Sequence, residues 1–300
     1  ADKNNNRVWI ISGNGDGTFQ APVARDTGSS GTYLAAGDVN GDGKLDLVLA
    51  TSEPDSGSSS DLPTLYLPGN GNATFQTGVT INGATGATHI LLADISGDGK
   101  LDLIATRKGA FGSTTNPGGV TIILGNGNGT FRTAISSNTS AIGGGHFILA
   151  DIDSNNRPDL IFLQTASSGA DGKIYYSIIN ANGSFQTKTV LNSSIPALSN
   201  AFLGVADLNS DNRKDLLVVD YASTKTYSIM ADSQGRIGTG SAIKTSSVVN
   251  ASSQLPFFSD FNKDQKTDLA IASYGSGLSI FPGLGDGGFS SGTNYQETSR

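Results

Sequence analysis

Short apolar runs alternate along the chain with turns rich in Gly, Asn and Asp. Residues 8–11 (VWII) and 120–124 (VTIIL) are runs of this kind, and an Asn-Gly pair follows each of them closely. Short runs rich in β-branched residues are typical of strands. Asn-Gly and Asp-Gly pairs favour tight hairpin turns, because such turns need a positive φ. The pattern therefore predicts an all-β chain of short antiparallel strands.

Two motifs repeat along the chain, out of phase with each other. An aspartate-rich motif occurs five times, and its first aspartates stand 56, 57, 56 and 53 residues apart. Its copies lie at residues 35–50, 91–106, 148–163, 204–219 and 257–272. A glycine-rich turn motif occurs six times, at residues 13–19, 69–75, 125–131, 180–185, 232–237 and 283–289. Such regularity indicates one structural unit that is copied along the chain.

Each repeat reads as four short strands, with the aspartate motif between the first two and the glycine-rich turn between the last two. Repeated four-stranded units predict a β-propeller, here with five complete repeats and an N-terminal half repeat. We expect one domain over residues 1–300, with a half blade at 1–27 and blades at about 28–82, 83–139, 140–192, 193–246 and 247–300. The alternative is a tandem array of small sandwiches, but a unit of about 55 residues is small for a core of its own.

The aspartate motif has the spacing of a cation-binding loop. In its first copy, Asp38-Val39-Asn40-Gly41-Asp42-Gly43-Lys44-Leu45-Asp46, side-chain oxygens fall at positions one, three, five and nine. The backbone carbonyl of position seven turns inward beside them. Hard oxygen ligands at this spacing suit Ca²⁺. The expected ligands are Asp38, Asn40, Asp42, Lys44, Asp46, Asp94, Ser96, Asp98, Lys100, Asp102, Asp151, Asp153, Asn155, Arg157, Asp159, Asp207, Asn209, Asp211, Arg213, Asp215, Asp260, Asn262, Asp264, Lys266 and Asp268.

These loops differ from EF-hands, which end with a bidentate Glu at position 12. Position 12 here is Leu49, Ala105, Phe162, Val218 or Ile271, and strands flank the loops. Fifteen of the 26 acidic residues lie in the five loops, so five bound Ca²⁺ would change the net charge from −7 to about +3. We expect up to five structural calcium ions, with the fifth loop weakest because Gln265 suits the turn at position six poorly. The alternative reading is that the loops are merely polar turns.

Composition excludes several other classes of protein. The pI is about 4.7, which argues against a nucleic-acid partner, since such proteins present a basic face. The chain has no Cys and two His, and no apolar run approaches the length of a membrane-spanning helix. These features predict no disulfide framework, no thiolate metal site and no membrane insertion. Catalysis also has little support, because Glu53 and Glu297 are the only two Glu residues.

The motifs DVNGDGKLDL, DISGDGKLDL, GNGDGTF and GNGNGTF resemble those of FG-GAP/VCBS repeats. The resemblance covers nearly the whole chain and is most specific in the first two repeats. It implies an integrin-α-like propeller with Ca²⁺ in the loop between the first two strands of each blade. It also implies a secreted or cell-surface protein whose partner is a glycan or an extracellular protein. The half repeat at the N-terminus suggests part of a larger polypeptide, or a hairpin that packs on a five-bladed ring.

The connections at the opposite end of the blades vary in length and sequence, so we expect a ligand there. Five residues before the first aspartate of four repeats stand Tyr33, His89, His146 and Phe202, which form the expected ligand rim. Ordinary channel packing is the alternative role for these side chains. The function we expect is a calcium-stabilised binding module, most simply lectin-like and not an enzyme. One alternative is a protein-interaction or adhesion module. Another is an accessory domain of a polysaccharide-active enzyme, in which Arg107 and Asp55 would be among the candidate catalytic residues.

Overall fold

The computed structural model describes residues 6–28, 31, 33–50, 62–107, 119–137, 147–164, 173–191, 195, 198, 201–237, 243–247, 256–273 and 277–295. Every regular element in these ranges is a strand, which confirms the all-β prediction. Among the described residues we find no helix of the length and apolar character needed to cross a bilayer.

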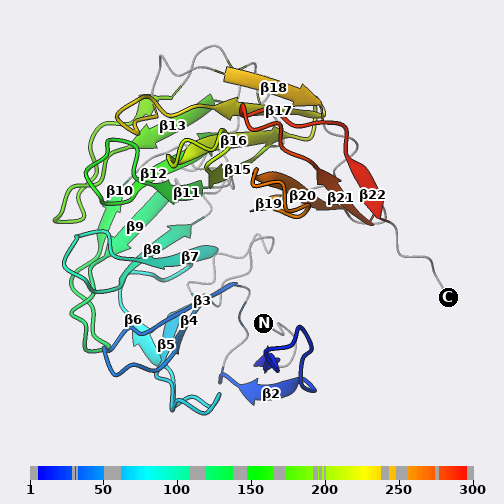
Figure 1. Cartoon of the computed structure of the whole chain (residues 1–300). Coiled ribbons are helices and arrows are strands. Elements are labelled where there is room, and N and C mark those ends of the chain that lie inside the picture. The colour runs from blue at the N-terminus through cyan, green and yellow to red at the C-terminus, as the bar shows by residue number, and fades with distance from the viewer. Residues whose placement is uncertain are drawn as a thin grey trace. The chain divides into compact units, whose positions relative to one another are not determined.

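The strands form one two-stranded and five four-stranded antiparallel sheets (Figure 1). Their bounds are β1 (Arg7–Ile10), β2 (Val23–Asp26), β3 (Tyr33–Gly37), β4 (Asp46–Ala50), β5 (Thr64–Leu67), β6 (Val79–Ile81), β7 (His89–Ala93), β8 (Asp102–Arg107), β9 (Gly119–Ile123), β10 (Ile135–Ser137), β11 (Phe147–Ala150), β12 (Asp159–Gln164), β13 (Lys173–Ser177), β14 (Thr189–Val190), β15 (Ala201–Ala206), β16 (Asp215–Asp220), β17 (Lys225–Ile229), β18 (Ile243–Ser247), β19 (Pro256–Ser259), β20 (Asp268–Ser273), β21 (Gly277–Phe281) and β22 (Thr293–Tyr295).

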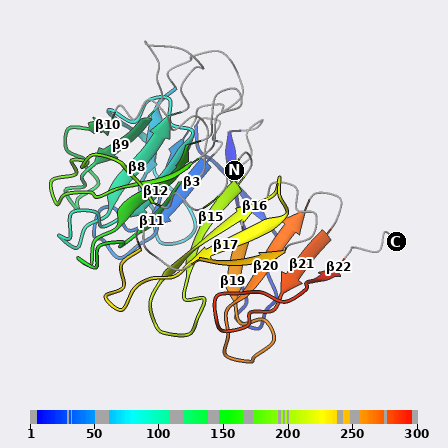
Figure 2. The ribbon, with the colours of Figure 1, turned by 90° about the horizontal axis from the view of Figure 1, so that it is seen from above.

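Each four-stranded sheet follows the chain order, so each repeat is one blade. Blades one to five are the sheets β3–β6, β7–β10, β11–β14, β15–β18 and β19–β22. Figure 2 shows the last blade with β19 to β22 side by side. The hairpin β1–β2 carries the first glycine-rich turn and corresponds to the last two strands of a blade. The four-stranded units predicted from the repeats are therefore present.

The chain divides into two compact units, each with its own core. The first comprises Ala1–Gly144 with Ile179–Phe185, and the second comprises Gly145–Ile178 with Gln186–Arg300. In the first unit, blades one and two pack through residues such as Val48 and Leu103, which are fully buried. In the second unit, side chains of blades three and four form one cluster, and those of blades four and five form another. A single domain over residues 1–300 remains a prediction.

The aspartate at position nine of each loop opens the second strand of its blade and is fully buried. These residues are Asp46, Asp102, Asp159, Asp215 and Asp268, all 0% exposed. In blade one, the Val39 amide donates to Asp46 Oδ2 at 3.0 Å and the Gly69 amide donates to Oδ1 at 2.7 Å. The Tyr66 hydroxyl donates to Oδ2 at 3.1 Å as well. One carboxylate thus ties the aspartate-rich loop to the glycine-rich turn.

The same pair of backbone bonds recurs in other blades. In blade two, Asp102 accepts from the amides of Ile95 and Gly125 at 2.9 and 2.8 Å. In blade four, Asp215 accepts from the amides of Leu208 and Ala231 at 2.9 and 2.8 Å. In blade five, the amides of Phe261 and Gly283 bind Asp268 at 2.9 and 2.8 Å. In these blades, the turn between the first two strands and the turn between the last two strands are therefore held together at one end of the sheet, as the motif spacing predicts.

The residue at position two also links a blade to the next one within each unit. Its carbonyl accepts a backbone amide of the following glycine-rich turn. The Gly129 amide donates to Val39 O at 3.4 Å in the first unit. In the second unit, the Ile237 amide donates to Ile152 O at 3.3 Å and the Gly287 amide to Leu208 O at 3.1 Å. The carbonyl of the position-two residue therefore joins each of these blades to the next blade by one backbone hydrogen bond.

We expect the substitution Asp215→Ala to destabilise the protein strongly. It removes two charge-assisted hydrogen bonds and leaves two buried amides without an acceptor, which costs roughly 3 to 6 kcal/mol. Asp286→Ala is the control, because Asp286 is exposed and its carboxylate makes only an ion pair with Lys244 and one hydrogen bond from the Gly288 amide, which together are worth about 1 to 2 kcal/mol. Chemical denaturation measures both variants. Equal losses of stability in the two would contradict the structural role of Asp215.

Candidate functional site

The five aspartate-rich loops, numbered one to five along the chain, share one backbone conformation. In loop one (residues 38–46), the Gly41 amide donates to Asp38 Oδ1 at 2.8 Å and the Gly43 amide to Oδ2 at 2.8 Å. The Asp42 amide donates to Asn40 Oδ1 at 2.9 Å. Corresponding bonds fold the other loops around their own first aspartates. The oxygen atoms of positions one and three are therefore gathered on the inside of each loop.

Positive φ angles occur at both position four and position six of every loop. The residues at position four are Gly41, Gly97, Ser154, Ser210 and Lys263, and those at position six are Gly43, Gly99, Asn156, Asn212 and Gln265. The sequence analysis anticipated position six and overlooked position four. The first two loops use Gly at both positions, whereas the last three hold side chains in a conformation that costs L-residues energy. The fifth loop, with φ of 65° at Lys263 and 67° at Gln265, bears the least suitable residues.

Cationic side chains at position seven neutralise a carboxylate in some loops. Lys44 Nζ lies 3.3 Å from Asp42 Oδ2, and Lys100 Nζ lies 3.6 Å from Asp98 Oδ2. Arg213 pairs with Asp211 in the same way. Position five of loop three is Asn155, so Arg157 has no carboxylate there. The position-seven residues, expected to contribute carbonyl oxygens, thus also influence the loops through their side chains.

Loop three gathers the densest carboxylate cluster in the described part of the chain. Ligand atoms of Asp151, Asp153 and Asp159 all lie within 4.8 Å of one another. Among the described residues, no other group of three acidic or imidazole side chains meets this criterion. Three carboxylates this close repel each other unless a cation lies between them. Loop three is therefore the loop whose side chains best fit a divalent cation.

Loop two contains a second feature that favours a cation. The Ser96 hydroxyl, at position three, is shielded from solvent and interacts with the Asp98 carboxylate at position five. Two oxygen atoms brought together in this way are suited to coordinate a hard cation. In the same loop, burial raises the pKa of Asp102, despite amide hydrogen bonds that oppose the shift, and the nearby Asp98 charge adds to the rise. Burial likewise raises the pKa of Asp215 in loop four. The residues present fit Ca²⁺ chemically.

The expected ligand rim is only partly assembled. Tyr33 opens β3 and His89 opens β7, and their rings lie 4.0 Å apart between centroids at an angle of 40°. Tyr33 is 38% exposed. Burial lowers the pKa of His89, which favours the neutral imidazole. His146 lies outside the described residues.

Phe202 does not suit the expected rim. It is 6% exposed and lies in the core between blades four and five. Its ring packs edge-on against Tyr221, with centroids 5.2 Å apart. Because a neighbouring aromatic side chain covers it, this phenyl ring contributes to packing, which was the alternative role for these positions.

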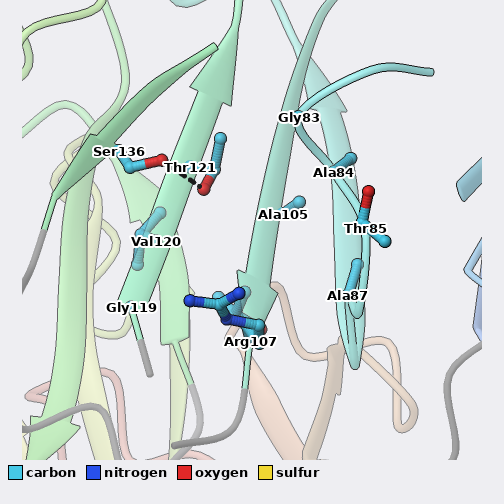
Figure 3. Close-up of a pocket in the computed structure, with 11 residues that line it drawn as sticks. Gly83, Ala84, Thr85, Ala87, Ala105, Arg107, Gly119, Val120, Thr121 and Ser136 are labelled. Atoms are coloured by element: carbon cyan, nitrogen blue, oxygen red, sulfur yellow. Dashed lines mark hydrogen bonds between the residues drawn. The ribbon is translucent and has the colours of Figure 1, made fainter. Parts of the chain in front are cut away.

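A pocket of about 80 Å³ opens at the end of blade two that faces away from the aspartate-rich loops. One wall is the segment that joins blades one and two, including Gly83, Thr85 and Ala87. The other wall is the sheet itself, with Ala105 and Arg107 on β8 and residues 119–121 on β9. Figure 3 shows Arg107 at the end of β8, on the strand next to Gly119. The pocket therefore lies at the end of the blade where a ligand is expected.

The polar groups of the pocket stand on neighbouring strands. Thr121 pairs with Ala105 on one side and with Ser136 on the other. The Thr121 and Ser136 hydroxyls lie 3.0 Å apart and are hydrogen-bonded, as Figure 3 shows. His89 of the rim pairs in register with Thr106, another lining residue. The rim and the pocket thus belong to the same end of blade two.

Backbone bonds fix the connecting segment on both sides. The Thr64 hydroxyl donates to Ala84 O at 2.7 Å, and the Gly86 amide donates to Leu62 O at 2.9 Å. The Thr88 amide donates to Thr106 O at 2.7 Å. This segment is therefore attached to blade one and blade two at once, and the pocket is formed before any ligand arrives.

The sequence pointed to Arg107 only as a suspect of the enzyme alternative, and it gave no indication of the other pocket residues. The available signal was the small size of Ala105 and Thr121, seen when the repeats are compared position by position. No single repeat shows by itself that these two residues are unusually small for their positions.

Comparison with known families gives one match to the sequence. Residues 1–49 match the FG-GAP-like repeat model, a span that includes the first aspartate-rich loop. The chain contains an FG-GAP-like repeat. This finding confirms, for residues 1–49, the resemblance that the motifs suggested. Among curated proteins, none matches the sequence of this chain.

Solved structures share the fold of this chain. One is a lectin from Agrocybe aegerita, described as recognising non-reducing terminal N-acetylglucosamine, with a TM-score of 0.62 and 18% identity over 94% of this chain and 73% of the lectin. Another is an α-L-arabinofuranosidase from Fusarium graminearum, with a TM-score of 0.53 and 10% identity over 98% of this chain and 86% of the enzyme. At these identities the likeness concerns the fold, and it confirms the predicted β-propeller class.

We expect the double substitution Lys263→Gly and Gln265→Gly to stabilise the protein by about 1 kcal/mol. Glycine removes the left-handed strain at both positions, and part of this gain is offset by the greater entropy of the unfolded chain. Denaturation with a chelator present measures this effect without a contribution from cation binding.

The matched control is Gly99→Ala in loop two. An added Cβ there meets no atom within 4 Å, so its effect reports backbone strain alone. It should destabilise by about 1 kcal/mol. A destabilised double variant together with a neutral Gly99→Ala would show that the positive φ angles carry no cost.

Proposed function

We propose that this chain is a calcium-stabilised carbohydrate-binding module of lectin type that acts outside the cell, either secreted or at the cell surface. The observation that carries this proposal is the preformed pocket of blade two. Its Thr121 and Ser136 hydroxyls and the Arg107 guanidinium offer donors and acceptors in a small concave space. A few fixed polar groups in a concave site are the usual means of orienting a small ligand.

The fold comparison supports a saccharide as the ligand class. A lectin described as binding N-acetylglucosamine shares the fold, and so does an arabinofuranosidase described in complex with an iminosugar inhibitor. Glycoside hydrolysis usually requires two carboxyl groups that flank the scissile bond. The described lining of the pocket contains no carboxylate. We therefore assign this pocket binding without hydrolysis.

Calcium belongs to the opposite end of the blades in this proposal. The side chains at positions one, three, five and nine, with the carbonyl oxygen of position seven, would hold up to five ions. When bound, Ca²⁺ neutralises crowded carboxylates and closes the loop between the first two strands of a blade. Asn or Ser replaces a carboxylate at position three or five of every loop. Fewer charged ligands mean weaker sites, which suits the calcium levels met by extracellular modules.

Chelation should lower the melting temperature of the calcium-loaded protein. A cation that binds the folded state at 100 times its Kd stabilises that state by about 2.7 kcal/mol per site. Asp153→Asn should remove or weaken one site in a calorimetric titration with CaCl₂, since it takes one of three converging carboxylates from loop three. Asp16→Asn, in a glycine-rich turn outside the loops, should leave the titration unchanged. A melting curve that does not respond to chelator would refute the calcium assignment.

A glycan array probed with the calcium-loaded protein tests the carbohydrate assignment. We expect binding to a discrete set of glycans, reduced after chelation if the loops support the pocket's surroundings. A blank array obtained with folded, calcium-loaded protein would reject a lectin function and direct attention to a protein partner. Detectable turnover of a bound glycan would reject pure binding.

A further inference from the structure

The pocket of blade two exists because small side chains occupy a position that larger ones fill elsewhere. Three residues after the position-nine aspartate, the five blades carry Leu49, Ala105, Phe162, Val218 and Ile271. Leu49 and Phe162 are 1% and 0% exposed, so both fill their sites. The cross-strand partner of this residue is Leu65 in blade one, Thr121 in blade two and Tyr175 in blade three. Blade two alone among these three combines a small residue with a hydroxyl.

The next residue on the same face of β8 adds a cation. Arg107 stands five residues after Asp102, where the other blades carry Thr51, Gln164, Asp220 and Ser273. Its cross-strand partner is Gly119, which has no side chain to occupy the space beside it. Arg107 is exposed, and none of the ion pairs formed by the described residues involves it. The guanidinium is thus available to a ligand.

The charge around this pocket is opposite to that of the chain. The net charge is −7, yet residues 62–93 and 103–150 contain no Asp or Glu. These two stretches provide every lining residue of the pocket. Of the cationic residues in these stretches, Arg107 lines the pocket, whereas Arg132 pairs with Asp98 beside loop two. A local positive potential with no acidic residue in either wall favours an anionic ligand.

We propose that this pocket binds the anionic group of an acidic saccharide, either a uronic acid carboxylate or a sugar sulfate, with Arg107 as the anion-binding residue. The guanidinium forms two parallel hydrogen bonds with an oxyanion, which fixes the orientation of the sugar. The Thr121 and Ser136 hydroxyls, 3.0 Å apart, exchange hydrogen bonds with sugar hydroxyls next to the anion. The proposal rests on the carbohydrate-binding function and adds the class of ligand and the residue that selects it.

The test compares matched ligands by isothermal titration with the calcium-loaded protein. The probes are an oligogalacturonate, its methyl ester, a chondroitin sulfate oligosaccharide and a neutral chitin oligosaccharide. We expect the oligogalacturonate to bind at least tenfold more tightly than its methyl ester, or the sulfated probe at least tenfold more tightly than the neutral one. The probe that binds identifies which oxyanion the pocket takes.

Three variants locate the binding. Arg107→Gln should weaken the acidic ligand at least tenfold, and Arg107→Lys should restore part of the affinity. Arg7→Gln is the control, since it removes the same charge from an exposed residue of β1 and should change affinity less than twofold. Thr121→Leu introduces the residue that blade one carries at this position, so it fills the pocket with a side chain compatible with the fold. It should abolish binding while the melting temperature is retained.

The outcomes separate this inference from the proposed function. Equal binding of acid and ester together with equal binding of sulfated and neutral probes, or equal effects of Arg107→Gln and Arg7→Gln, would overturn the anion site. Neutral glycans that bind the array and are unaffected by Arg107→Gln would overturn it too, and the carbohydrate-binding function would stand. The absence of binding to any saccharide would reject both.

Discussion

The buried carboxylate at position nine of each aspartate-rich loop is the interaction on which the rest of the fold depends. In blades one, two, four and five it accepts one amide from the first turn of the blade and another from the last turn. An ionised group with no exposure is stable in a protein interior only when its hydrogen-bonding capacity is satisfied. The amides provide that satisfaction, so the two turns and the carboxylate require one another. Calcium, in our proposal, acts on a framework that these bonds have already shaped.

In this arrangement, one end of each blade stabilises the fold and the other end is available for recognition. One end is committed to the repeated motifs, because both of its turns bind the same carboxylate. Among the described residues, no carboxylate joins two turns at the other end in this way, and the connections there differ in sequence from blade to blade. The pocket beside Arg107 lies at the unconstrained end. Recognition can therefore be altered there without loss of the bonds that hold the blade together.

The sequence was sufficient for the fold because the repeats encode it locally. Gly, Asn and Asp at fixed spacing specify the turns, and the apolar runs between them specify the strands. The motif spacing also identified the loop oxygens, since positions one and three are gathered by bonds within nine residues. Position four was missed, because Ser154 and Lys263 give no sign from their identity that they adopt positive φ. The role of Asp46 as an acceptor for the distant Gly69 amide was not evident from the loop alone.

The ligand side was less predictable for a different reason. The rim was inferred from a shared sequence position, but side-chain burial depends on the residues packed around that position, and Phe202 is covered by Tyr221 of its own blade. The pocket exists because Ala105, Thr121 and Gly119 have small side chains or none, so the space between the strands and the connecting segment is not filled. Such unfilled side-chain volume can be recognised only when the cross-strand partners of each residue are known. The sequence therefore indicated the end of the blade at which the pocket lies, and the residues of the pocket emerged only from the three-dimensional structure.

The backbone hydrogen bonds between neighbouring blades have a consequence for the evolution of a repeat protein of this kind. They join backbone groups, such as the Gly129 amide and Val39 O, and so do not depend on which side chains either repeat carries. A copied repeat can therefore be inserted next to any other and still find its partner. Duplication and exchange of whole repeats would preserve the framework, while each copy remains free to acquire a binding specificity of its own.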